Sequence, residues 1–162
     1  MLYTLRPGQT QLEPYVPKGK FAGPQGIVVS SDGKSLFVAD YARGIFHVDR
    51  ATHETTWLEP PKDAALTGID GLTSYQGDLL AIQNGVRPHR VLRIAIDVPG
   101  KTIRRVEVVQ MNHPAFDEPT LGVVVGRDFF YVANSQWGHF DKGVLQSPDK
   151  LAEPVILKMP LE

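Results

Sequence analysis

The stretch that decides the fold is Gly26-Ile-Val-Val-Ser30, Asp32-Gly33 and Ser35-Leu-Phe-Val-Ala-Asp40. It holds two short runs of β-branched and aromatic residues, which favour strands. The Asp-Gly pair between them predicts a two-residue hairpin turn, because glycine accepts the positive φ that such a turn needs. Two further runs follow at Gly44-Ile-Phe-His-Val-Asp49 and Thr55-Thr-Trp-Leu58. The four runs predict four antiparallel strands in succession.

The same pattern occurs twice more along the chain. Its opening glycines, Gly26, Gly71 and Gly122, lie 45 and 51 residues apart. Four strands at a period of roughly 40–50 residues are typical of β-propeller blades. A β-sandwich also has many short strands, but it does not repeat the same glycine, turn and terminal Asp or Asn. The strands expected in the second copy are 71–75, 79–84, 90–96 and 103–109; those in the third are 122–126, 129–134, a strand near 143–145, and 154–158.

The opening segment fits the last two strands of a preceding blade. It contains Leu2-Tyr-Thr-Leu5, a Pro7-Gly8 turn and Gln11-Leu-Glu-Pro-Tyr-Val16. The prediction is therefore an all-β chain, an incomplete β-propeller of three four-stranded blades preceded by two outer strands. The expected boundaries are 1–21, 22–66, 67–118 and 119–162. Such an arrangement leaves an apolar face uncovered at each end, so the expected partner is either the missing blades or a second copy of the chain.

Composition excludes several classes of function. The 162 residues contain no cysteine, which excludes disulfides, thiolate metal sites and a cysteine nucleophile. The net charge of -1 gives no bulk attraction to nucleic acid or to an anionic membrane, and neither is expected as a partner. No apolar run approaches the roughly 20 residues that span a bilayer. Because Met1–Arg6 shows no signal-peptide pattern, a soluble chain is expected, with the cytoplasm and the periplasm both left open.

A propeller brings particular positions together at one mouth of its channel. The residue before each inner strand shares that mouth with the residue that ends each second strand. Oxygen-bearing side chains occupy five such positions: Gln25, Asp70, Asp40, Asn84 and Asn134. Carboxylate and amide oxygens suit a hard divalent cation, Ca²⁺ above all, with Mn²⁺ or Zn²⁺ as alternatives. Gln25, Asp70 and Asn84 are the predicted metal ligands; alternatively, Asp and Asn end strands because they bond nearby backbone amides.

Asp70 stands out among these residues. It lies in Gly68-Ile-Asp-Gly-Leu72, where its neighbours are too small or too apolar to pair with a carboxylate, although an ordinary Asp-Gly turn is the alternative. Glu118 and Trp137 are expected in the same pocket, together with Asp40 and Asn134. His89 lies in a connection that reaches this face, where it is either a general base or an ordinary loop residue.

These residues also carry a family resemblance. The stretch 23–41 resembles a blade opening of the gluconolactonase / senescence-marker-protein / luciferin-regenerating-enzyme superfamily. Glu118-Pro-Thr-Leu-Gly-Val-Val-Val125, with Tyr131-Val-Ala-Asn-Ser-Gln-Trp137, resembles the closing blade of its bacterial members. The resemblance covers essentially the whole chain. Its motifs distinguish this superfamily from WD40 and kelch repeats but are also similar to NHL-type repeats.

The resemblance implies a six-bladed propeller with a divalent metal in the central pocket. Members are lactonases or related hydrolases, in which the metal polarises the substrate carbonyl and an aspartate handles the proton. Asp70 matches the aspartate of the superfamily's Pro-Asp-Gly-like motif, with Ile69 in place of proline, so the resemblance implies that Asp70 is the catalytic residue. Gln25 stands where many members have a ligand asparagine. Because the superfamily's glutamate ligand comes from an earlier blade, the chain is expected to be a C-terminal half, inactive alone on lactone or ester substrates. The alternative is a non-enzymatic, NHL-like binding scaffold.

Overall fold

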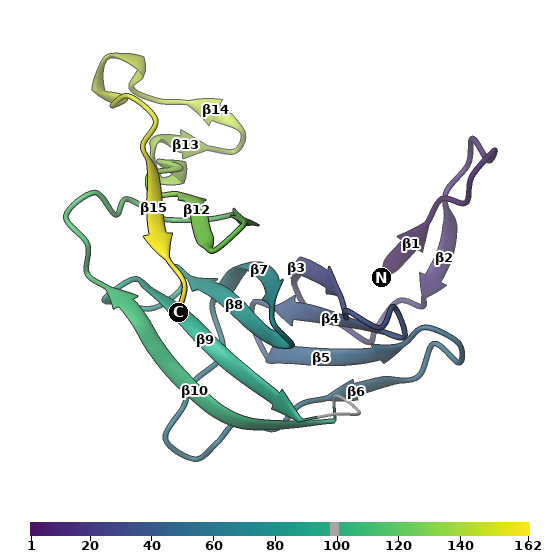
Figure 1. The fold of residues 1–162 in the computed structure, drawn as a ribbon. Helices are drawn as coiled ribbons and strands as arrows, with labels where there is room; N and C mark the ends of the chain where they lie inside the picture. The colour runs from purple at the N-terminus through teal and green to yellow at the C-terminus, as the bar shows by residue number, and fades with distance from the viewer. Residues whose placement is uncertain (98–100) are drawn as a thin grey trace.

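The computed structural model describes residues 1–97 and 101–162 and shows an all-β chain, an incomplete propeller-like fold (Figure 1). Antiparallel sheets follow one another along the chain, with an N-terminal hairpin at one end and the closing blade at the other. Within the described part, helical structure is limited to two three-residue 3₁₀ turns, η1 (Trp137–His139) and η2 (Pro148–Lys150). No helix in these ranges is long and apolar enough to cross a membrane. The predicted fold class is confirmed.

The N-terminal hairpin and the first blade follow the predicted strand order. In the hairpin, β1 (Leu2–Thr4) pairs with β2 (Glu13–Val16), as expected for two outer strands. The first blade has the sheet order β3-β4-β5-β6. Its strands are β3 (Pro24–Val29), β4 (Ser35–Asp40), β5 (Gly44–Asp49) and β6 (Thr55–Trp57).

The first hairpin turn of this blade is longer than the sequence predicts. Val29 pairs with Leu36, and the connection between the two strands spans residues 30–34 rather than the two residues Asp32-Gly33. The Asp32 carboxylate accepts hydrogen bonds from the Ser30 hydroxyl (2.6 Å) and from the backbone amide of Lys34 (3.0 Å). These local bonds stabilise a wider loop, in which Gly33 still has a positive φ of 70°.

The second blade has four strands, as predicted, in the order β7-β8-β9-β10. Its first turn consists of Gln76 and Gly77, both with positive φ, which is the signature of a type I′ hairpin. The strands are β7 (Ile69–Tyr75), β8 (Asp78–Gln83), β9 (Arg90–Asp97) and β10 (Thr102–Met111).

The closing blade differs from the prediction of four strands. Its sheet contains three: β11 (Gly122–Val125), β12 (Asp128–Val132) and β15 (Ile156–Pro160), which pairs directly with β12. The strand expected near residues 143–145 is instead β14 (Val144–Leu145), which forms a separate hairpin with β13 (Phe140–Asp141). The reason is the turn at Lys142 and Gly143, where both residues have positive φ and fold the chain straight back.

The repeated glycines lie where neighbouring inner strands approach most closely. A Cβ atom on Gly26 of β3 would lie 2.6 Å from the backbone nitrogen of Leu72 and 2.7 Å from the carbonyl oxygen of Asp70, both in β7. A Cβ atom on Gly71 would collide with the backbone of Thr120, directly before β11. The glycines at this repeat position therefore allow β3, β7 and β11 to converge.

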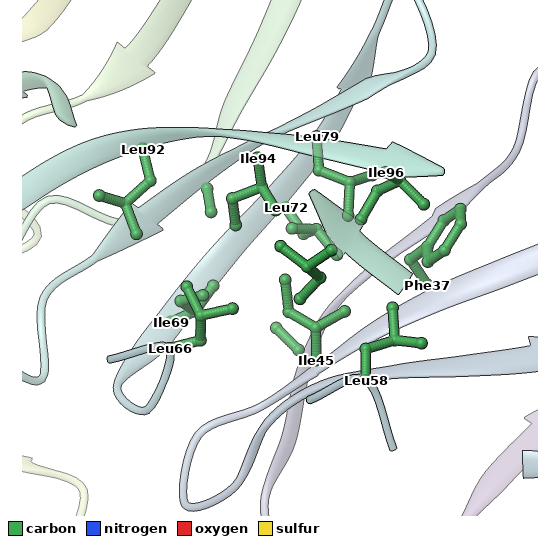
Figure 2. Packing of buried hydrophobic residues seen from close by; sticks show 13 residues of the cluster. Phe37, Ile45, Leu58, Leu66, Ile69, Leu72, Leu79, Leu92, Ile94 and Ile96 are labelled. Atoms are coloured by element: carbon green, nitrogen blue, oxygen red, sulfur yellow. The ribbon is translucent and has the colours of Figure 1, made fainter. Parts of the chain in front are cut away.

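The hydrophobic core lies between the sheets rather than within any one of them. Figure 2 shows the largest cluster, in which Phe37 and Ile45 of the first blade pack against Leu79 and Ile94 of the second. A second cluster joins the other face of the second blade to Phe129 and neighbours in the closing blade. A third joins the N-terminal hairpin to the first blade. Each blade is thus stabilised by burial of apolar area against its neighbour.

An apolar face is exposed at each end of this array. Ile27 and Val29 of β3 are 49% and 45% exposed, because the N-terminal hairpin covers only part of that face. On β11 of the closing blade, Val123 and Val125 are 57% and 59% exposed. Faces of this kind usually pack against further protein.

Candidate functional site

A cavity of about 490 Å³ opens where the inner strands begin. The starts of β3 and β7 and the segment before β11 surround it, together with the ends of β4 and β8. Of the predicted site residues, five line it and are brought together from four distant parts of the sequence. The described lining residues are Gln25, Tyr41, Asp70, Asn84, Glu118, Thr120, Leu121 and Trp137.

Asp70 lies half-buried at the start of β7, facing this cavity. Its Oδ2 accepts a hydrogen bond from Asn84 Nδ2 (3.0 Å). Burial raises the pKa of the Asp70 carboxyl above its ordinary value; the hydrogen bond from Asn84 offsets part of this, and the negative charge of Glu118 adds to it. Asp70 therefore holds a proton more readily than a surface aspartate.

The carboxamide of Asn84 has an orientation set by its partners. Its Nδ2 donates to Asp70 Oδ2 and to the carbonyl oxygen of Pro119 (3.0 Å). Because a carbonyl oxygen can only accept, the nitrogen of the carboxamide must lie on the side of Pro119. Its Oδ1 accepts a hydrogen bond from the Tyr41 hydroxyl (3.1 Å). Asn84 therefore links β8, β7 and the segment before β11, and its Oδ1 keeps one lone pair for a ligand.

Tyr41 is a site residue that the sequence reasoning missed. Burial raises the pKa of its hydroxyl, and the charges of Asp70 and Glu118 raise it further, so Tyr41 stays a hydrogen-bond donor at neutral pH. Its only signal in the sequence is its place directly after Asp40, where the second strand of the first blade ends.

Two glycines bring the loops of this site together. The Gly68 amide donates to the carbonyl of Tyr41 (2.6 Å), and the Gly85 amide donates to the carbonyl of Gly68 (3.0 Å). A Cβ atom on Gly68 would lie 2.7 Å from the Cα of Gly85, and Gly68 has a φ of +73°. Glycine alone tolerates both the close approach and the positive φ at position 68. The contact between Gly68 and Gly85 therefore positions Tyr41, Asp70 and Asn84 relative to one another.

Glu118 is held by the long connection between β12 and β15. Its backbone has a φ of +58°, uncommon for a residue other than glycine. Its carbonyl accepts from the Ser135 hydroxyl (2.7 Å), and its Oε2 accepts from the Gly138 amide (2.9 Å). The same connection places Trp137, whose side chain is 62% exposed, at the cavity wall.

The lining residues form a donor set made only of oxygen. Carboxylates come from Asp70 and Glu118, and carboxamides come from Gln25 and Asn84. The lining residues in the described part of the chain include no lysine, arginine or histidine to neutralise the two carboxylates. Within residues 1–97 and 101–162, no three His, Cys, Asp or Glu side chains gather closely enough to hold a metal, so the carboxamides are needed to complete a set. Such a set fits a hard cation better than a softer one.

Asp40 and Asn134 do not line this cavity, although the repeat predicts them there. Asp40 is fully buried, and its Oδ2 accepts from the backbone amides of Ala22 (2.6 Å) and Gly23 (3.2 Å). Its Oδ1 accepts from the amides of Ala42 and Arg43 (both 3.1 Å). The carboxylate of Asp40 therefore caps the backbone amides of two connections, the one before β3 and the one after β4.

Asn134 is held in the same way by the closing blade. Its Nδ2 donates to the carbonyl of Glu153 (2.9 Å), and its Oδ1 accepts from the amide of Val155 (2.6 Å). It thus anchors the chain that leads into β15. Two of the three polar residues that end second strands are therefore structural, and only Asn84 faces the cavity.

His89 also lies outside the cavity lining. Its side chain is 5% exposed, and neither ring nitrogen has a hydrogen-bond partner among the described residues. The structure therefore does not bring His89 to this cavity, and its ring is buried instead.

The site therefore combines a carboxyl group with a raised pKa, a second carboxylate, two carboxamides and an exposed indole around one cavity. Its carboxylate and carboxamide oxygens are of the kind that hard cations take as ligands. In comparisons with known proteins, no family model matches this sequence, and no curated protein matches it.

Proposed function

We propose that this chain carries half of the site of a divalent-cation-dependent, gluconolactonase-like hydrolase. The observation that carries the proposal is the cavity at the start of the inner strands, where Asp70 and Glu118 meet Gln25 and Asn84 with no cationic side chain among the described lining residues. Ca²⁺ is the expected cation, with Mn²⁺ and Zn²⁺ as alternatives. The resemblance to the gluconolactonase superfamily supports a lactone or ester substrate.

Each residue has a defined role in the proposal. Asp70, Gln25 and Asn84 are the expected ligands, with Glu118 as a further carboxylate at the same cavity. A bound divalent cation polarises a substrate carbonyl. Asp70, whose pKa is raised by burial, is suited to take up and release a proton beside that carbonyl. Tyr41 holds Asn84 in place, and Trp137 offers an apolar wall for the substrate ring.

The test of this proposal is hydrolysis by the longest natural reading frame that contains the chain. Simple aldonolactones would be assayed with Ca²⁺, Mn²⁺ and Zn²⁺. Loss of a proton-transfer group typically costs about 100-fold or more in rate, so Asp70→Asn is expected to lower kcat/KM by at least that factor. Asp63→Asn makes the same chemical change at an exposed position and serves as the control. Unchanged activity in Asp70→Asn would remove this residue from the mechanism.

The proposal assigns the remainder of the site to further propeller blades or to a second copy of the chain. The apolar faces at Ile27 and Val29 and at Val123 and Val125 are the surfaces that these would cover. Light scattering on the chain distinguishes further blades from a second copy. A discrete dimer supports the second copy, whereas aggregation supports further blades.

The second candidate function is a non-enzymatic, NHL-like binding scaffold. The capping roles of Asp40 and Asn134 favour it, because these oxygens serve the backbone instead of a ligand. The exposed indole of Trp137 also suits contact with a partner. Calorimetric binding of a divalent cation with micromolar affinity would contradict a pure scaffold. Absence of binding for Ca²⁺, Mn²⁺ and Zn²⁺ would support it.

A further inference from the structure

A second cavity, of about 680 Å³, lies between the first and second blades at the opposite end of their inner strands. The first cavity lies where β3 and β7 begin, whereas this one lies beside the turns where they end, around residues 30–35 and 74–79. The two cavities share no described lining residue. A volume of this size is typical of small-molecule sites.

Three apolar side chains from two blades form one wall of this cavity. They are Phe37 of β4, Leu79 of β8 and Ile96 of β9. Figure 2 shows them together at one end of the interblade cluster, so the cavity continues directly from the core. This wall is suited to the flat face of an aromatic ring.

A buried histidine supplies a polar anchor beside this wall. His47 of β5 is 3% exposed, yet it lines the cavity. Its Nε2 pairs with the Ser35 hydroxyl at 2.8 Å, and the described hydrogen bonds leave its Nδ1 unused. Burial is the main cause that lowers the pKa of His47, so the imidazole is neutral at physiological pH. One nitrogen therefore remains to donate to or accept from a ligand, depending on the tautomer.

The charged groups around the cavity nearly balance. A hydrogen bond from the Ser30 hydroxyl, the largest cause, lowers the pKa of Asp32, and backbone amides led by that of Thr52 lower the pKa of Asp49. Both carboxylates therefore stay ionised at neutral pH, and two lysines, Lys34 and Lys101, also line the cavity. The other two lining carboxylates have arginine partners: Asp78 pairs with Arg93 (2.7 Å), and Asp97 pairs with Arg104 (4.0 Å). The cavity therefore favours no particular charge on a ligand.

We propose that this cavity binds a small phenolic compound. A phenol hydroxyl both donates and accepts, so it pairs with Nδ1 of His47 in either tautomer. Its ring packs on Phe37, Leu79 and Ile96. The site is independent of the proposed hydrolase site, so either proposal can fail alone.

The test is a titration of the intact chain with three matched probes, followed through backbone amide chemical shifts. Tyrosol is a neutral phenol and tyramine is its cationic analogue. Phenethylamine is tyramine without the hydroxyl. Tyrosol and tyramine are expected to shift the amides of residues 30–35 and 74–79. Phenethylamine is expected to bind about tenfold more weakly than tyramine, as one lost hydrogen bond implies.

Two variants locate the binding. Ser74→Phe places a ring in the cavity and is expected to abolish binding of tyramine. Asp70→Asn, in the other cavity, is expected to bind tyramine as the wild-type chain does. The wild-type probe series stands even if Ser74→Phe does not fold. Shifts centred on Asn84, no shift with either tyrosol or tyramine at millimolar concentration, or equal binding of tyramine and phenethylamine would each overturn the proposal.

Discussion

The closest approach between the first and second blades is tested by adding one methyl group at Gly26. In Gly26→Ala, the new Cβ would lie 2.6 Å from the nitrogen of Leu72, 2.7 Å from the carbonyl oxygen of Asp70 and 2.8 Å from the Cβ of Leu72. Two of these three atoms belong to the backbone, so no side-chain rotation relieves the contact. The strands β3 and β7 must separate, although they hold the largest core cluster between their blades.

The size of the effect follows from the cost of overpacking. Extra methylenes in a packed interior cost about 1–3 kcal/mol, and this contact is with backbone, so we expect the upper end, about 3 kcal/mol. For a chain of this size, 1 kcal/mol lowers Tm by about 2–4 °C, so the expected decrease in Tm is about 6–12 °C.

The assay is urea unfolding, with Tm measured in parallel. The matched control is Gly138→Ala, because a Cβ there meets nothing within 4 Å and the glycine does not have a left-handed φ. Its free energy of unfolding is expected within about 0.5 kcal/mol of the wild-type value. If Gly26→Ala is as stable as Gly138→Ala, the inner strands do not converge as described.

Three further predictions concern buried groups. Asp40→Ala leaves the backbone amides of Ala22, Gly23 and Ala42 without their acceptor, whereas that of Arg43 keeps the carbonyl of Asp40, and the substitution is expected to lower the free energy of unfolding by about 3 kcal/mol or more in urea; a loss under 1 kcal/mol would contradict the capping role. Burial raises the pKa of Tyr131 to about 12, so a spectrophotometric titration should show a late phenol ionisation that is missing in Tyr131→Phe. Burial lowers the pKa of His47 below 6.5, so as the pH falls this imidazole binds a proton in the unfolded chain before it does so in the folded chain. The stability advantage of the wild-type chain over His47→Gln is therefore present above pH 6.5 and falls as the pH drops through the folded-state pKa, and an advantage that grows toward acid pH would refute this.

The sequence predicts most of the fold because the repeated glycines mark positions where the structure has no space for a side chain. Glycine recurs at positions 26, 71 and 122 where a side chain has no room: the first two face neighbouring backbone, and a Cβ on Gly122 would lie 2.5 Å from the Phe129 ring. The prediction for the closing blade is wrong only in its third strand, because Val144 and Leu145 resemble a blade strand locally. The positive φ of Lys142 and Gly143 decides their pairing, and Lys142 gives no sequence signal for it.

The site was predictable in position but not in orientation. Strand order brings Asp40 and Asn84 to the same end of their blades, yet Asp40 turns inward to four amides while Asn84 faces the cavity. Sequence alone does not show which backbone amides lie within reach of a side chain. Tyr41 was missed for the same reason, because its role depends on a hydrogen bond to Asn84 across 43 residues.

The central claim is that Asp70 and its neighbours form a divalent-cation site, and a calorimetric titration of the chain with Ca²⁺ tests it most directly. The expected Kd lies at or below about 10⁻³ M, the weak end of protein Ca²⁺ sites, because carboxylates are few and carboxamides complete the set. Asp70→Asn is expected to weaken binding at least tenfold, whereas Asp63→Asn leaves it unchanged. Tb³⁺ used in place of Ca²⁺ should show luminescence sensitised by Trp137, which Trp137→Phe removes. Absence of binding at 10 mM Ca²⁺, set about tenfold above the weakest Kd of such sites, or equal binding by the wild-type chain and Asp70→Asn, would contradict the account.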